Sequence, residues 1–155
     1  MGAQSMLVRD MNQEECRDLL VRLGFGRLGC ASNNQPYVVP IYFAYEANCL
    51  FGFSTAGQKI EWMRSNPLVC VAADEIVGED NWTSVLAFGR YEELLDNPKY
   101  AARRLNAHAL LEQRTFWWRE AIATSQTRKE EVRPEPILYC IHIDKMTGHR
   151  ASPDR

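Results

Sequence analysis

The segment FGFSTAGQKIEWMRSNP, residues 51–67, places a strand, a turn and a helix in one short stretch. Its first residues are aromatic and β-forming, Ala56-Gly57 marks a turn, and Asn66-Pro67 ends the helical pattern that follows. The start of a helix carries unpaired N–H groups and a partial positive charge, which together bind anions. The glycine permits close approach of a ligand, and Lys59 adds a full charge. The pattern is typical of a phosphate site.

Side chains around this turn add hydrogen-bond donors to the helix N–H groups. The candidates are the hydroxyls of Ser54 and Thr55 and the ammonium of Lys59. In the simpler alternative, Lys59 is exposed to solvent and Thr55 does no more than cap the helix. These residues alone leave both interpretations open, because Thr-x-Gly-x-Lys at a helix start is a common pattern.

The sequence on either side predicts an antiparallel sheet. Six strand-like segments are found, at residues 26–32, 36–46, 49–54, 68–76, 82–95 and 137–151. Most of their connections are too short for parallel neighbours, which need a longer crossover. Pro40 lies inside the second segment, which predicts an edge strand, a bulge or a place where a ligand meets the backbone. Many short antiparallel strands in one small domain, residues 1–155 with a core at about 12–149, favour a closed or nearly closed barrel.

Three helices complete the predicted domain. The first spans residues 12–24, where Asn12 and Glu15 form a capping-box pattern and Gly24 suits the left-handed end. The second follows the opening turn. The third spans residues 98–123 and begins at Asn97-Pro98. It contains Trp117 and Trp118, which are interpreted as core or dimer packing, with a roof over a ligand as the alternative.

Composition excludes several classes of protein. Eighteen basic and twenty acidic residues give a net charge of -2, so neither a nucleic acid nor an anionic membrane is expected as a partner. The first residues lack the pattern of a signal peptide, and no apolar run is long enough to span a membrane, so we expect a cytoplasmic protein. Five cysteines contain no CxxC pair. They are interpreted as small buried hydrophobic residues, with a redox or metal role as the alternative.

No catalytic side chain can be assigned from the sequence. The three histidines form no HxxxH or HxxE pair, so no metal site is predicted. His142 stays an alternative candidate as a haem ligand. Motifs of hydrolases are absent, which fits a protein whose cofactor carries the chemistry. Tyr42, Tyr45 and His142 are retained as candidate proton donors.

Three motifs in series resemble the FMN-binding split-barrel superfamily, which includes pyridoxamine 5'-phosphate oxidase and the 5-nitroimidazole reductase-like proteins. They are PYVVPIYFAY at residues 36–45, GQKIEWMRSNP at residues 57–67 and SVLAFGRYE at residues 84–92. The resemblance covers roughly residues 26–96. It implies a mainly β fold, a six-stranded antiparallel split β-barrel that dimerises and holds FMN in two symmetric clefts between the subunits.

The resemblance also implies which residues contact the cofactor. Pro40, Ile41, Tyr42 and Phe43 would run beneath the isoalloxazine ring, partly through backbone groups. Thr55, Gln58 and Lys59 would bind the phosphate. Ser84 would approach the ring system from the other subunit, with Trp82 lining the same cleft.

The chain departs from the oxidases themselves. Val38 and Phe43 stand where those enzymes carry an arginine and a lysine, and Gly57-Gln58-Lys59 replaces their Ser-Arg-Lys sequence. The closer resemblance is to the reductase-like branch. It implies an oxidoreductase that uses FMN, a small-molecule substrate and NAD(P)H as electron donor. A deazaflavin-binding or haem-binding split barrel, a non-catalytic flavin-binding protein and a colourless interaction module are the alternatives.

Overall fold

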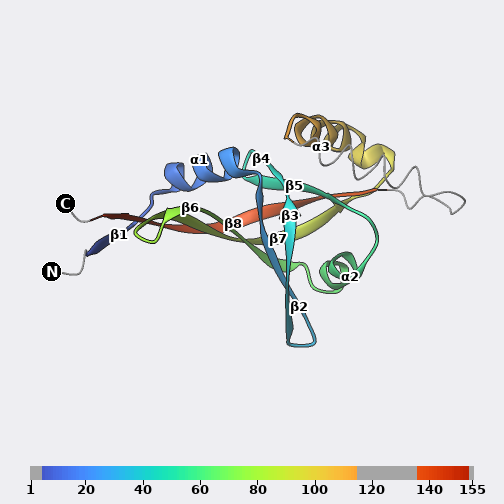
Figure 1. The fold of residues 1–155 in the computed structure, drawn as a ribbon. Helices are drawn as coiled ribbons and strands as arrows, with labels where there is room; N and C mark the ends of the chain where they lie inside the picture. Colours follow the sequence, from blue (N-terminus) through green and yellow to red (C-terminus); the bar gives the residue numbers. More distant parts are fainter. Residues whose placement is uncertain (1–4, 115–135, 154–155) are drawn as a thin grey trace, which may run out of the picture.

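A computed structural model describes residues 5–114 and 136–153 of the chain (Figure 1). The elements are, in order, β1 (Met6–Asp10), α1 (Gln13–Leu23), β2 (Phe25–Ser32), β3 (Gln35–Tyr42), β4 (Ala44–Glu46), β5 (Cys49–Ser54), α2 (Gln58–Ser65), β6 (Leu68–Gly78), β7 (Asn81–Leu94), the 3-10 turn η1 (Pro98–Tyr100), α3 (Ala101–Arg114) and β8 (Ile137–Pro153). In the described ranges, no helix is both long and apolar enough to cross a membrane.

The strands form one antiparallel sheet that curls into a split barrel. Its order is β3-β2-β6-β7-β8-β5-β4, and β1 pairs with the end of β8. The strands β3 and β4 lie at opposite ends of this order, yet only Phe43 separates them in the chain. The sheet must therefore curl until its two ends approach each other. The N–H of Phe43 donates to the carbonyl of Gly24 at 2.9 Å, which fixes this junction.

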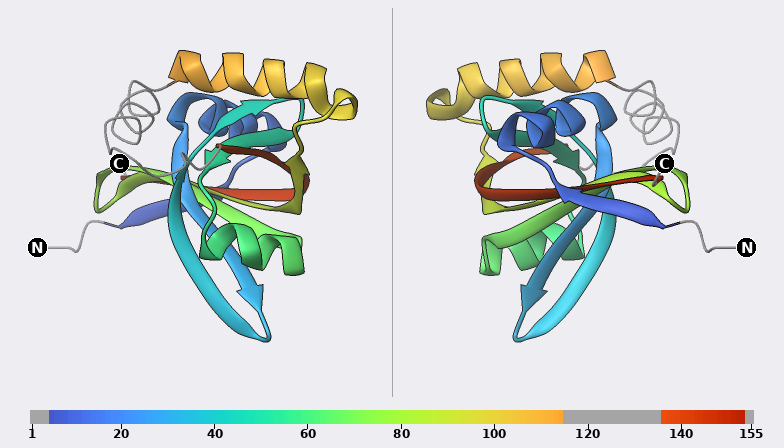
Figure 2. Two further views of the ribbon diagram at one scale, coloured as in Figure 1. Left: turned by 90° about the vertical axis from the view of Figure 1, so that its right-hand side faces the viewer. Right: turned by 90° about the vertical axis from the view of Figure 1, so that its left-hand side faces the viewer.

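Two apolar clusters lie on the two faces of the curled sheet. The larger one fills the barrel and includes Leu28, Val71, Val85 and Ile141. The smaller one lies between the sheet and α3 and includes Phe51, Leu138, Cys140, Ala107 and Leu111. Figure 2 shows α1 and α3 on one side of the strands and α2 on the other, with the β2–β3 hairpin projecting past α2. Successive residues of β8 alternate between the clusters, as expected for a strand covered on both faces.

The predicted start of the first helix is confirmed in detail. Asn12 accepts a hydrogen bond from the N–H of Glu15 at 2.8 Å, and the Glu15 carboxylate accepts one from the N–H of Asn12 at 3.2 Å, which is a capping box. Gly24 adopts the left-handed conformation with φ of 65°. Pro98 occupies the first turn after Asn97. The third predicted helix is present as η1 and α3 up to Arg114, and its continuation to residue 123 lies outside the described residues.

The number of strands differs from the prediction, because the described residues form a sheet of eight strands rather than six. The predicted strand at residues 36–46 is divided at Phe43 into β3 and β4, which lie at opposite ends of the sheet. Its apolar pattern continues across the break because Phe43 is itself buried in the barrel. The additional strand β1 is exposed along its whole length, so no burial pattern signals it. Pro40 lies on β3, which is an edge strand, the first of the three alternatives that its position predicts.

Candidate functional site

The start of α2 is open to a ligand. Gly57 is the N-cap, so no side chain caps the helix, and the first helical bond runs from the N–H of Glu61 to the Gly57 carbonyl at 3.1 Å. A methyl group built on Gly57 would meet no atom within 4 Å. The N–H groups of the first turn therefore face space that can accept an anion.

Lys59 lies half-buried in that first turn. It forms no hydrogen bond or ion pair with any residue of the two described ranges, and burial lowers the pKa of its ammonium. A partly desolvated charge without a partner is unfavourable, and a bound anion removes that cost. The alternative of a fully solvated lysine is therefore wrong for this side chain.

The other residues that are predicted to contact the phosphate differ in their exposure to solvent. Thr55 and Gln58 are exposed beside the turn, so both can reach a bound anion. Ser54 is buried, and its hydroxyl donates to the carbonyl of Thr55 at 2.8 Å. In this conformation Ser54 orients the turn, since its only hydroxyl proton is already used.

The predicted ring-binding segment, residues 40–43, presents two side chains outward and two inward. Ile41 and Phe43 are buried in the barrel, so they can meet a ligand only through backbone groups. Pro40 is exposed, and Tyr42 is half-buried with its ring 5.0 Å from that of Phe25. Because β3 is an edge strand, one side of its backbone pairs with no other strand of the described sheet. An earlier part of the same strand lies against α2, since Tyr37 of β3 packs against Trp62 of α2 with ring centroids 5.3 Å apart.

Trp82 and Ser84 are not brought to this place within one chain. Both are half-buried on β7 near its turn with β6, where Trp82 pairs with Ile76. The helix α2 joins β6 at the opposite end, where Leu68 pairs with Arg90. Within one chain, Trp82 and Ser84 therefore lie at the other end of the β6–β7 pair from α2.

The remaining sequence candidates lie apart from α2 or pack around it. His142 is outside the barrel, with its Nε2 2.8 Å from a carboxylate oxygen of Glu92. Tyr45 packs against the barrel cluster. Trp117 and Trp118 lie outside the described residues.

An apolar groove of about 510 Å³ crosses the outer surface of the sheet and was missed from the sequence. It runs over β2, β3, β6 and β7 and is lined by Val38, Leu68 and Phe88, which are 64%, 65% and 43% exposed. Leu68 and Phe88 are followed and preceded by buried residues along β6 and β7, and the neighbours of Val38 on β3 are half-buried, so each strand carries apolar residues on both faces. That two-sided pattern is the signal that could have revealed the groove.

Comparison with known proteins identifies a family that the sequence matches and solved structures that have a similar fold. The model of the family described as pyridoxamine 5'-phosphate oxidase matches residues 12–150. An uncharacterised protein of Rhizobium meliloti (strain 1021) is 38% identical over 146 residues, which are 94% of this chain and 97% of the relative.

Two solved structures extend the comparison. An FAD-binding protein of Mesorhizobium loti is 39% identical, with a TM-score of 0.78 over 96% of this chain and 99% of that one. A putative 5-nitroimidazole antibiotic resistance protein of Bacteroides thetaiotaomicron is 18% identical, with a TM-score of 0.66 over 98% of this chain and 93% of that one. The second likeness is one of fold alone.

Proposed function

The chain belongs to the pyridoxamine 5'-phosphate oxidase family, and on this premise we propose that it is a homodimeric oxidoreductase that binds FMN. The observation that carries the proposal is the half-buried ammonium of Lys59, which has no partner among the described residues and lies beside a helix start without a side-chain cap. The FAD-binding relative of 39% identity supports a flavin, because FAD contains the FMN unit with its phosphate. When bound, the flavin supplies two-electron transfer from a donor such as NAD(P)H to a small-molecule acceptor.

The residues of the chain bind and orient the cofactor in this proposal. Lys59 and the N–H groups at the start of α2 hold the phosphate, and Thr55 and Gln58 add hydrogen bonds from the exposed rim. The outer edge of β3 at Pro40 and Tyr42 positions the ring through backbone groups. These contacts fix the reactive part of the cofactor relative to the barrel, which is the protein's main task in a flavoprotein.

The second copy of the chain is proposed to cover the apolar groove. An apolar surface with exposed Val38, Leu68 and Phe88 is typical of an interface between subunits. The division of the predicted site between the two ends of β7 supports the same conclusion, because a partner is then needed to bring Ser84 to α2.

The substitution Leu68→Asp is expected to convert the dimer to a monomer. It places an unpaired carboxylate in the centre of the groove, and burying such a charge is strongly unfavourable. Sedimentation equilibrium measures the mass directly. Leu105→Asp is the matched control, because Leu105 is 75% exposed on α3, away from the groove, and this variant is expected to remain dimeric. A dimeric Leu68→Asp protein would contradict the proposed interface.

The cofactor assignment is tested by the absorbance spectrum of the purified protein, before and after addition of excess FMN and desalting. Retained flavin bands support the proposal, and a screen of NAD(P)H with small acceptors then tests turnover. A haem band, or a deazaflavin spectrum in place of a flavin one, would overturn the FMN assignment. Flavin binding without turnover by any donor would leave a non-catalytic flavin-binding protein.

A further inference from the structure

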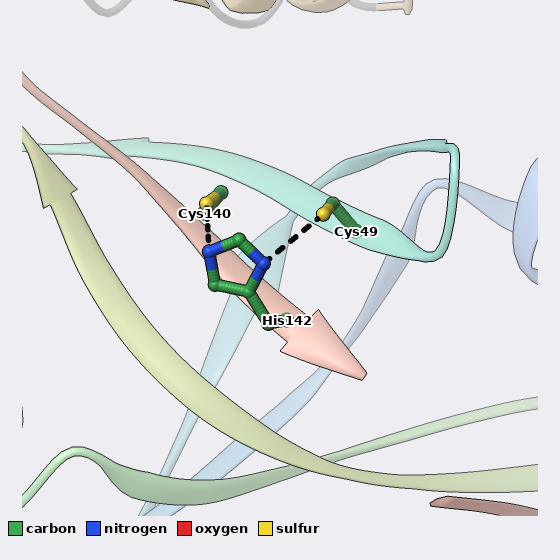
Figure 3. A group of neighbouring side chains, drawn as sticks. All are labelled: Cys49, Cys140 and His142. Atoms are coloured by element: carbon green, nitrogen blue, oxygen red, sulfur yellow. Dashed lines mark hydrogen bonds between the residues drawn. The ribbon is translucent and has the colours of Figure 1, made fainter. Parts of the chain in front are cut away.

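Two cysteines and a histidine converge on the sheet face that α3 covers. Cys49 lies at the start of β5, and Cys140 and His142 lie on β8, where His142 pairs with Cys49 across the strands (Figure 3). The Cys49 sulfur is 3.5 Å from Nδ1 of His142, and the Cys140 sulfur is 3.3 Å from Nε2. The ligand atoms of the three side chains all lie within 4.8 Å of one another.

A charged shell orients the imidazole and one of the sulfurs. Nε2 of His142 lies 2.8 Å from the Glu92 carboxylate, which can only accept a hydrogen bond, so Nε2 carries the proton. The lone pair is then on Nδ1, which points towards Cys49. Arg103 of α3 contacts Glu92 at 2.8 Å and donates to the Cys140 sulfur at 3.0 Å. A carboxylate that fixes a histidine tautomer is the usual outer partner of a metal-bound imidazole.

From this arrangement we propose that Cys49, Cys140 and His142 bind one zinc ion. Two thiolates and a neutral imidazole are the donor set that zinc prefers, and three protein ligands leave a fourth position open. Tetrahedral zinc with Zn–S of about 2.3 Å and Zn–N of about 2.0 Å sets its ligand atoms roughly 3.5 to 3.8 Å apart. The Cys49 sulfur and Nδ1 of His142 already have this spacing. The Cys140 sulfur lies beside Nε2 and has to turn towards Nδ1 to complete the site.

The charges around the site balance once zinc is present. The two thiolates neutralise the ion, and Glu92 is neutralised by Arg103. Cys49 and His142 are only half-buried, which leaves an approach for the ion, whereas Cys140 is fully buried. Thiolate ligands are stabilised by donors such as the Arg103 guanidinium, which already faces Cys140.

The zinc site is separate from the proposed flavin site. Ile141 and Ile143 point into the barrel cluster, whereas Leu138 and Cys140 belong to the cluster under α3. The start of α2 follows Ser54, and Ser54 pairs with Ile137, five residues along β8 from His142. Loss of zinc binding is therefore distinguishable from loss of flavin binding.

The test uses Co²⁺ as a spectroscopic probe of the full-length protein, kept reduced with a phosphine that does not bind the metal. We expect one equivalent of Co²⁺ to produce thiolate-to-cobalt charge-transfer absorption and tetrahedral ligand-field bands, and Zn²⁺ to displace it. Cys49→Ser and His142→Gln should each weaken Co²⁺ affinity at least tenfold. Glu92→Gln should weaken it by roughly 10- to 100-fold while keeping the thiolate band, the effect expected of an orienting partner.

Cys70→Ser is the matched control, because Cys70 is also half-buried in a strand but lies on β6, outside the cluster. It should bind Co²⁺ as the wild type does. Circular dichroism shows whether each variant is folded. The proposal is overturned if the reduced wild type gives no thiolate–cobalt band, or if Cys49→Ser gives the same band at the same affinity.

Discussion

Replacing Lys59 with alanine is expected to weaken FMN binding by about 1.5–3 kcal/mol, or roughly 12- to 160-fold in Kd, the scale of a hydrogen bond to a charged group. The ammonium is half-buried and has no partner among the residues that the structure describes, so its charge is available to the phosphate. Low exposure to water also strengthens its attraction to an anion. Quenching of flavin fluorescence measures the Kd.

Two control variants test whether the loss of affinity comes from the charge of Lys59. Lys99→Ala removes an exposed lysine on η1 and is expected to leave the Kd unchanged. Lys59→Met keeps the apolar stem of the side chain and should weaken FMN binding as alanine does. It should also leave the flavin-free protein at least as stable as the wild type, because it removes a half-buried charge that has no partner among the described residues. An unchanged Kd for FMN in both Lys59 variants would show that Lys59 does not bind the phosphate.

The second large effect concerns Gly89 of β7, which lies against the backbone of β8. A methyl group on Gly89 would lie 2.3 Å from the backbone carbonyl oxygen of His142, next to the register shift between Phe88 and Gly89. The carbonyl belongs to a paired strand and cannot move as a side chain can. We expect Gly89→Ala to destabilise the protein by about 3 kcal/mol, the upper part of the usual range for overpacking. The gain from removing glycine in the unfolded chain, about 0.4–1 kcal/mol, is too small to offset this.

Gly78→Ala is the control for Gly89. It also lies beside a register shift, but the nearest atom to its added methyl group is 3.9 Å away, an ordinary contact distance. Its free energy of unfolding should stay within about 1 kcal/mol of the wild type. Urea denaturation of the flavin-free protein at one protomer concentration gives both values, since ligand and dimer formation each change apparent stability. Equal free energies of unfolding for the two variants would contradict the close approach of Gly89 to the backbone of β8.

The sequence predicts those features of the fold that local chemistry determines. The capping box of α1, the end of α2 at Asn66-Pro67 and the edge position of Pro40 all follow from residues that act on their immediate neighbours. The division at Phe43 does not, because it depends on where the sheet closes. A buried aromatic residue looks the same inside one long strand as it does between two strands at opposite ends of a barrel.

The prediction of site residues is likewise limited to residues that are neighbours in the chain. Lys59 and Gly57 are neighbours in the chain, so their role at a helix start can be predicted. Cys49 and His142 are far apart in the chain and meet only through the register of β5 against β8. Cys140 and His142, two residues apart on one face of a strand, are the only local signal of that cluster, and metal motifs based on helical spacing do not include it.

The proposed function centres on a phosphate held at the start of α2, and the most direct test compares FMN with riboflavin, which lacks the phosphate. Flavin-free wild-type protein is titrated with each under identical conditions. The account predicts that FMN binds at least about tenfold more tightly, and that Lys59→Ala removes most of this difference. Equal affinities of the wild type for FMN and riboflavin would contradict it.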